Sequence, residues 1–83
     1  MQIQFTNAGP NAVNFTIETR FFNHDILMQA MVQYAHVADS TLRFSFDEYT
    51  GQGSAIVGKG ILVGSFQVWP VIPPTKGGDL IAR

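Results

Sequence analysis

Between residues 12 and 22, apolar and polar side chains alternate almost without a break. One face would carry Val13, Phe15, Ile17, Thr19 and Phe21, and the other Asn14, Thr16, Glu18 and Arg20. A period of two is typical of a β-strand with one buried side. Gln2–Thr6 alternates in the same way, and the turn-forming residues 7–11 lie between the two segments. The pattern predicts an N-terminal antiparallel hairpin.

Residues 23–39 follow a different period. The polar residues lie three or four positions apart, at Asp25, Gln29, Gln33 and His36, and most of the others are apolar. This spacing predicts one helix over residues ~24–38, with Asn23 as its N-cap. Because the polar stripe is thin, we expect the helix to be largely buried. The alternative is that residues 26–38 pair as a strand, which would give a small all-β barrel.

The second half of the chain returns to strand patterns. We expect strands over residues 41–47, 54–57 and 61–69, with Gly58-Lys59-Gly60 at the tip of a hairpin. Gly64, inside the last strand, indicates a bulge or a close backbone approach. The predicted fold class is therefore α+β, with a small twisted antiparallel sheet of about five strands packed by one apolar helix. Residues 1–74 are expected to form a single compact domain and residues 75–83 a flexible C-terminal tail.

Residues 53–60, GSAIVGKG, resemble a phosphate-binding P-loop at first sight. That loop ends in Ser or Thr, whose hydroxyl holds Mg²⁺, whereas this segment ends in Gly60. The residues inside the segment are strand-like, and the residues after it are a poor start for a helix. We therefore predict a hairpin here. The aromatic residues expected in the core are Phe5, Phe15, Phe21, Phe44, Phe46 and Phe66.

Composition limits the possible functions. The chain is 46% apolar and 13% charged, about half the usual charged share, and its net charge is −1. No cysteine is present, so neither disulfides nor thiolate metal sites can form. We expect a cytoplasmic protein without a membrane segment, because no signal-peptide pattern and no apolar run of about 18 residues occurs. Part of the apolar surface is expected to lie in a subunit or protein-partner interface.

Candidate catalytic groups are sparse. His24 and His36 have no carboxylates at ligand spacing, and the neighbours Asp47 and Glu48 would point to opposite faces of a strand. We expect no metal and no cofactor. The first functional hypothesis is therefore a small non-enzymatic binding or assembly protein that acts as a homo-oligomer through an apolar surface.

A second hypothesis comes from the exposed cations and aromatics. A sheet that shows cations beside exposed rings could bind single-stranded nucleic acid, and the residues concerned are Arg20, Arg43, Lys59, Tyr49 and Trp69. The segment Leu42–Val68, with Asp47-Glu48, Gly51-Gln52 and Ser65–Val68, resembles the distal half of the single-stranded-DNA-binding proteins of filamentous phages. The resemblance implies a dimeric β-barrel.

A third hypothesis rests on residues 64–71, GSFQVWPV. This run is similar to the active-site strand of type II dihydrofolate reductases, where the corresponding strand lines a central pore in a tetramer. The resemblance implies an oligomeric enzyme with a site at a symmetry axis, built from Ser65, Gln67 and Trp69, and it makes nicotinamide-cofactor binding the discriminating test.

Overall fold

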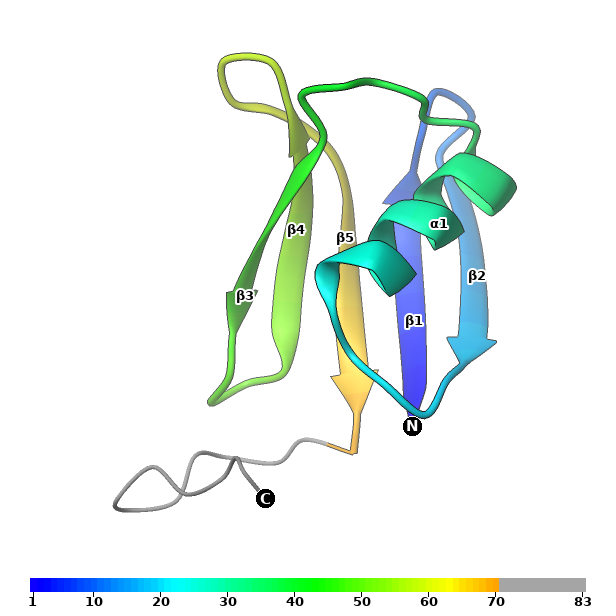
Figure 1. Ribbon diagram of the computed structural model, residues 1–83, viewed down its shortest axis with the longest axis vertical. Coiled ribbons are helices and arrows are strands. Elements are labelled where there is room, and N and C mark those ends of the chain that lie inside the picture. The colour runs from blue at the N-terminus through cyan, green and yellow to red at the C-terminus, as the bar shows by residue number, and fades with distance from the viewer. Residues whose placement is uncertain (71–83) are drawn as a thin grey trace.

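The computed structural model describes residues 1–70, which form one five-stranded antiparallel sheet and one α-helix (Figure 1). The strand order is β2-β1-β5-β4-β3, with β2 and β3 at the two open edges. The predicted α+β fold class is confirmed. The alternative of a small all-β barrel is wrong, because the sheet does not close and residues 26–35 are helical.

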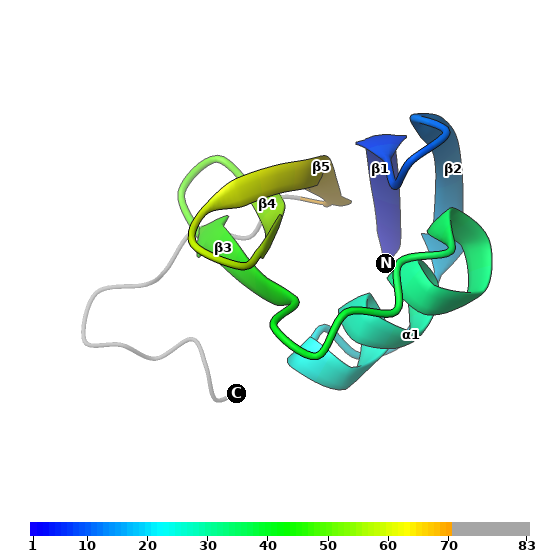
Figure 2. The same ribbon diagram turned by 90° about the horizontal axis from the view of Figure 1, so that it is seen from above.

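The sheet is built from two units that the helix connects along the chain. The N-terminal hairpin and the C-terminal meander consist of β1 (Gln2–Ala8), β2 (Val13–Glu18), β3 (Arg43–Asp47), β4 (Gln52–Val57) and β5 (Ile61–Trp69). The helix α1 (His24–Ala35) connects these two units. β5 pairs with β1 and joins the units into one sheet. The sheet curves, and α1 lies on the inner side of the curve (Figure 2).

The helix begins as predicted but ends three residues before the predicted end. The Asn23 side chain accepts a hydrogen bond from the Ile26 N–H at 2.9 Å and caps the first turn. His36 adopts a left-handed conformation, with φ 59°, and this change of backbone conformation ends the helix after Ala35. The expectation of a largely buried helix is wrong: only one side is buried, and Val32 and Tyr34 are 44% and 48% exposed. No second layer of the described structure covers that outer side.

Aromatic rings fill the space between the helix and the sheet. Phe5 stacks on Phe15 with ring centroids 4.7 Å apart, and Phe66 lies 5.8 Å from Phe5. Phe66 also packs near Phe22, Phe44 and Phe46. Its ring occupies space that a side chain at position 53 would need, since a Cβ there would lie 2.2 Å from the Phe66 Cζ. The glycine in β4 is therefore required by the position of this ring.

Two of the predicted core aromatics, Phe21 and Phe46, are exposed. Phe21 is 66% exposed because β2 ends at Glu18, four residues before the predicted end at Phe22. After the strand, the Thr19 hydroxyl donates to the Phe21 carbonyl and accepts from the Phe21 N–H, which turns the chain. Phe22 faces the core in its place, with its ring 4.5 Å from that of Phe46. Phe46 itself is 40% exposed, because it lies on the edge strand β3.

The glycine-containing segment over residues 52–69 forms the β4–β5 hairpin, with Gly58-Lys59-Gly60 at its tip, as predicted. The register shifts between the pairs Ala55↔Gly64 and Ile56↔Leu62, which leaves Val63 as the extra residue of a bulge. Gly64 also lies close to β1, because a Cβ at this position would be 3.1 Å from the Ala8 Cα. The segment that resembles a P-loop is therefore strand and hairpin tip, and it opens no helix.

The predicted boundary between the domain and its tail, at residues 74 and 75, lies outside the described residues. Residues 71–83, which contain the predicted tail at 75–83, lie outside the described residues. Among the residues described, the helix is too short to cross a membrane.

A hydrogen-bonded clasp ties the loop after α1 to the tip of the β4–β5 hairpin. The Asp39 carboxylate accepts hydrogen bonds from the Thr41 hydroxyl and the Thr41 N–H, and the Thr41 hydroxyl oxygen accepts one from the Gly58 N–H. The hydrogen bonds from the Thr41 side chain and backbone lower the pKa of Asp39 below its ordinary value of 3.8.

The two phenylalanines Phe5 and Phe21 should differ sharply in their contribution to stability. Phe5→Ala should lower the free energy of unfolding by about 3–5 kcal/mol, because it leaves a cavity at the centre of the core. Phe21→Ala should lower it by less than about 0.5 kcal/mol, because its side chain is mostly in solvent. Urea denaturation followed by circular dichroism measures both, and Phe5→Leu serves if Phe5→Ala does not fold. Equal losses would contradict the described core.

The hydrogen bonds of the clasp predict that the stability of the protein depends on pH in the acid range. A lowered pKa means that Asp39 contributes stability above its unfolded-state pKa, and that this contribution is lost as the pH falls through the folded-state pKa. Thr41→Val removes the hydroxyl donor, so the pKa of Asp39 should rise towards its ordinary value. An NMR titration of the carboxyl carbon measures it, with Thr6→Val as a control on the opposite side of the sheet. An unchanged Asp39 pKa in Thr41→Val would show that the hydroxyl is not responsible.

Candidate polar binding face

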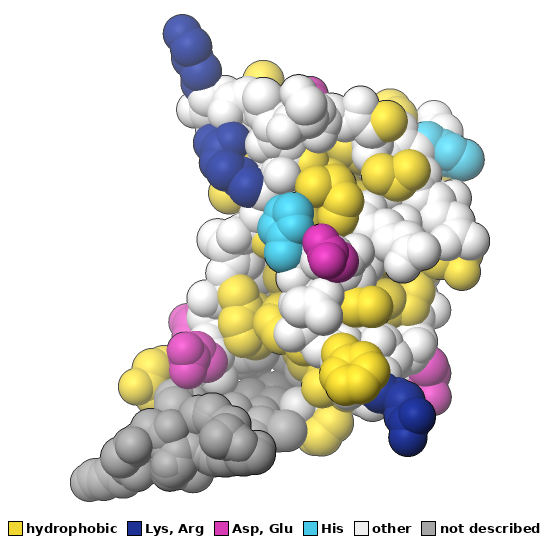
Figure 3. Space-filling view, viewed as in Figure 1, with side chains coloured by type: hydrophobic (Ala, Val, Ile, Leu, Met, Phe, Trp, Pro, Cys, Tyr) yellow, Lys and Arg dark blue, Asp and Glu magenta, His cyan; other side chains and the backbone are white. Residues whose placement is uncertain are grey.

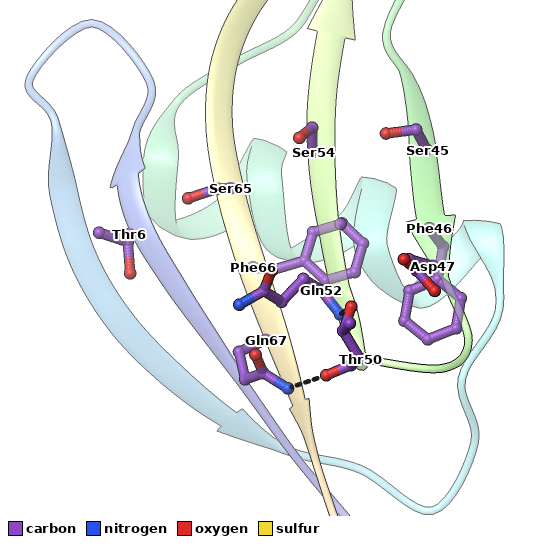
Figure 4. Close-up of a pocket in the computed structure, with 11 residues that line it drawn as sticks. Thr6, Ser45, Phe46, Asp47, Thr50, Gln52, Ser54, Ser65, Phe66 and Gln67 are labelled. Atoms are coloured by element: carbon purple, nitrogen blue, oxygen red, sulfur yellow. Dashed lines mark hydrogen bonds between the residues drawn. The ribbon is translucent and has the colours of Figure 1, made fainter. Parts of the chain in front are cut away.

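The side of the sheet that faces away from α1 carries two rows of polar side chains (Figure 4). The strand registers align Gln4, Gln67, Gln52 and Asp47 in one row, from β1 across β5 and β4 to β3. They align Thr6, Ser65, Ser54 and Ser45 in the next. We call these eight residues the glutamine face. Neighbouring side chains in a row are about 4.8 Å apart, the spacing of paired strands.

A shallow open hollow of about 650 Å³ lies over the glutamine face. All of its members except Gln4 line the hollow, together with Thr50 in the β3–β4 turn and with Phe46, Gly53 and Phe66. In Figure 4 the labelled side chains come from four adjacent strands and the turn, while α1 lies behind the sheet. The hollow is large enough for several sugar-sized or residue-sized groups.

Hydrogen bonds hold one end of the hollow in place. The Gln67 side-chain amide donates to the Thr50 carbonyl at 2.9 Å and to the Val68 carbonyl at 3.1 Å. The Asp47 carboxylate accepts the Tyr49 N–H at 2.9 Å. Backbone hydrogen bonds from Gly51 to Asp47 and from Val68 to Gly51 add to this arrangement. The β3–β4 turn is thus fastened to β5, and a ligand would meet a preformed surface.

The chemistry of the face is almost entirely neutral. Of its eight residues, only Asp47, on the edge strand, carries a charge. Within residues 1–70, the side-chain amides of Gln4 and Gln52 make no hydrogen bond to the protein, and no group of three His, Cys, Asp or Glu residues could hold a metal ion. Each of these two amides offers two N–H donors and a carbonyl acceptor, and each hydroxyl offers one donor and can also accept. The Gln67 N–H groups already donate to the Thr50 and Val68 carbonyls, so this amide offers a ligand its carbonyl oxygen. The face is suited to a ligand that presents neutral hydrogen-bonding groups.

Two of the residues predicted as a site, Ser65 and Gln67, belong to the glutamine face. Trp69, the third residue of that set, lies two residues further along β5 and therefore on the same side, where it pairs with Gln2 and is 48% exposed. Tyr49 projects from the β3–β4 turn and is also exposed. The alternation of β5 therefore predicted the side of the sheet for all three β5 residues.

The predicted cations are not gathered at one place. Arg20 follows β2 and Arg43 belongs to β3, and these strands are the opposite edges of the sheet. Figure 3 shows the dark blue Lys and Arg side chains at opposite corners of the helix-covered side. The Arg43 guanidinium donates to the Gly58 carbonyl at 2.8 Å, which places it at the hairpin tip with Lys59.

The aromatic residues lie far from that tip. Tyr49 precedes β4 and Lys59 follows it, and six extended residues span about 20 Å. The set Arg20, Arg43, Lys59, Tyr49 and Trp69 does not form a single surface, because the strand order separates its members. Sequence reasoning missed Gln4, Gln52 and Ser54 as members of a common face. Alternation indicated the outward side of Gln4, but only the strand order aligns it with Gln67.

Comparisons with protein family models, with curated proteins and with solved structures found no match to this chain. The described architecture also differs from the closed barrel implied by the resemblance to the phage DNA-binding proteins, since within residues 1–70 β2 and β3 remain unpaired on their outer sides. The assignment of a function therefore depends on the chemistry of the glutamine face.

The hydrogen bond from Gln67 to the turn can be tested against a glutamine on the neighbouring strand. Gln67→Ala should lower the free energy of unfolding by about 1 kcal/mol and speed amide exchange at residues 50–52, because the Thr50 carbonyl loses its partner. Gln4→Ala, directly opposite on β1, should cost less than about 0.5 kcal/mol. Hydrogen exchange by NMR measures both. Equal exchange rates in the two variants would show that Gln67 does not hold the turn.

Proposed function

We propose that this protein is a non-enzymatic binding module that holds a neutral, hydroxyl-rich ligand, a carbohydrate chain, on the glutamine face. The observation that carries the proposal is the row Gln4–Gln67–Gln52, which places three neutral amides side by side on the uncovered side of the sheet. A solvent-facing surface usually contains about a quarter or more of charged residues. This face has a single carboxylate, at its edge.

The chemistry of a sugar matches these groups. Its hydroxyls donate and accept hydrogen bonds, and amide and hydroxyl side chains can pair with them in both ways. The hollow is open along the sheet, which suits an extended chain better than a small enclosed molecule. The exposed ring of Trp69 lies beside the Gln67 row, where the C–H face of a sugar ring can stack on its apolar surface.

Single-stranded nucleic acid fits the face less well. Phosphates require several cations, but none of the eight residues of the glutamine face is a cation, and Arg20 and Arg43 lie at opposite edges of the sheet. The enzyme hypothesis with Ser65, Gln67 and Trp69 at a symmetry axis remains a prediction, to be tested by nicotinamide-cofactor binding.

Self-association is part of the proposal. The large apolar side chains that are exposed lie on several elements: Val32 and Tyr34 on α1, Ile61 and Leu62 on β5, and Phe21 after β2. These side chains do not form one apolar patch, so exposed apolar side chains alone do not identify the interface between copies.

Binding can be followed through Trp69, the only tryptophan of the chain. Titration with cellohexaose, maltohexaose and chitohexaose should change its fluorescence in a saturable way with at least one of them, and added salt should have little effect because the ligand is neutral. Gln52→Ala should weaken that binding by about two- to tenfold, the effect of one hydrogen bond. Gln29→Ala, on the helix at the other side of the sheet, is the matched control and should bind like the native protein.

Failure of all three sugars to bind, or equal affinities for Gln52→Ala and Gln29→Ala, would contradict the proposal. An oligodeoxythymidine titration at low and high salt provides the competing result. Salt-sensitive binding of the oligonucleotide, without binding of the sugars, would support the nucleic-acid hypothesis instead.

A further inference from the structure

The two open edges of the sheet differ in their protection against pairing with another strand. β3 has five residues and a charged side chain at each end, Arg43 and Asp47, and charges on an edge strand oppose strand addition. β2, with the sequence VNFTIE, carries a single charge, Glu18 at its end, and it has no Lys, Arg, Pro or Gly and no bulge within its last four residues. Within residues 1–70, no strand pairs with its outer side (Figure 1).

The free backbone groups of β2 can be assigned from its pairing with β1. Met1 and Thr19 exchange hydrogen bonds in both directions, at 2.8 Å and 2.9 Å. In an antiparallel ladder such pairs alternate with non-hydrogen-bonded ones, so Ile17 and Phe15 also direct their N–H and C=O groups towards β1. The N–H and C=O groups of Asn14, Thr16 and Glu18 therefore point away from the sheet.

The apolar side of β2 is only partly covered. Val13, Phe15 and Ile17 face the helix side but are all half-buried, whereas Ile3 and Phe5, on the adjacent strand β1, are fully buried. The ring of Tyr34 lies 5.2 Å from that of Phe15 and is itself half exposed. A small hollow of about 180 Å³ between β2 and α1 continues this incomplete packing. One more strand beside β2 would cover these side chains.

We propose that a second copy of this chain supplies that strand, and that the two β2 strands pair antiparallel about a two-fold axis at Thr16. In this register Thr16 lies opposite Thr16, Asn14 opposite Glu18, and Phe15 opposite Ile17. Every outward N–H and C=O group of Asn14, Thr16 and Glu18 then has a partner. Apolar side chains meet apolar ones on the helix side, and polar ones meet polar ones on the other.

The sequence of β2 favours a second copy over a foreign strand. The two-fold register places each Glu18 opposite a neutral Asn14, so like charges do not meet across the interface. A register centred on Phe15 would match only Asn14 with Thr16 and would leave the free groups of Glu18 beyond the pairing. The register centred on Thr16 uses the whole outward edge, and it is self-complementary as an isologous interface requires.

This pairing has a consequence for the glutamine face. Thr16 is paired with Gln4, so it belongs to the row Thr16–Gln4–Gln67–Gln52–Asp47. Joining two copies at Thr16 brings their rows into line, and the two faces become one surface on a continuous sheet. The dimer interface stands on the backbone geometry of β2 and does not depend on the identity of the ligand.

Cysteine cross-linking tests the register directly, because the native chain contains no cysteine. Residues opposite each other in a hydrogen-bonded antiparallel pair have Cα atoms about 5.5 Å apart, within the range that a disulfide spans. Thr16→Cys should therefore form a covalent dimer rapidly under mild oxidation. Ser45→Cys, on the same side of the sheet but on the opposite edge, is the matched control and should remain largely monomeric.

A second variant tests the non-covalent dimer. Native protein should sediment at twice the 9.1 kDa chain mass, and Thr16→Lys should sediment as a monomer, because two lysines would face each other at the axis. Native protein that stays monomeric at millimolar concentration would overturn the proposal, whether or not sugars bind. A dimer that persists in Thr16→Lys, or cross-linking that is no faster in Thr16→Cys than in Ser45→Cys, would also overturn it.

Discussion

The pairing of β1 with β5 is the interaction on which the rest of this structure depends. It joins the N-terminal hairpin to the C-terminal meander, and it acts on both sides of the sheet at once. On the helix side it sets Phe5 opposite Phe66, whose rings hold the core together. On the other side it sets Gln4 opposite Gln67. Since adjacent residues of a strand point to opposite sides, one register builds both the core and the candidate binding face.

The single helix explains why a polar side remains free. α1 covers the inner side of the curved sheet, and its Leu27, Ala30 and Met31 are buried there. In a chain of this size one helix covers one side only. The remaining side faces solvent, and its near absence of charge is the property on which the proposal of a neutral ligand rests. The fastening of the β3–β4 turn by Gln67 keeps this surface ordered.

Much of the local structure could be predicted from short-range patterns. Alternation placed the strands and assigned Ser65 and Gln67 to the outward side. Glycines indicated the β4–β5 hairpin and, at Gly64, a bulge or a close backbone approach; the structure has the bulge at the neighbouring Val63 and the close approach at Gly64. The errors came where a local change of backbone direction interrupts a pattern. The helix ends at Ala35 because His36 takes a left-handed conformation, although apolar residues continue to Ala38. Phe21 fits the alternation of β2, yet the turn formed by Thr19 directs it into solvent and Phe22 into the core.

The sequence by itself determined which segments are strands, which segment is the helix, and which side chains share a side of each strand. These properties follow from the periods of two and 3.6, and a few neighbouring residues are enough to express them. Only the tertiary structure decided that Gln4, Gln67 and Gln52 share a row and that Arg20 and Arg43 lie at opposite edges. Strand order depends on pairing between residues at opposite ends of the described chain, and the total packing of the core selects that pairing. No local pattern in the sequence predicts this strand order.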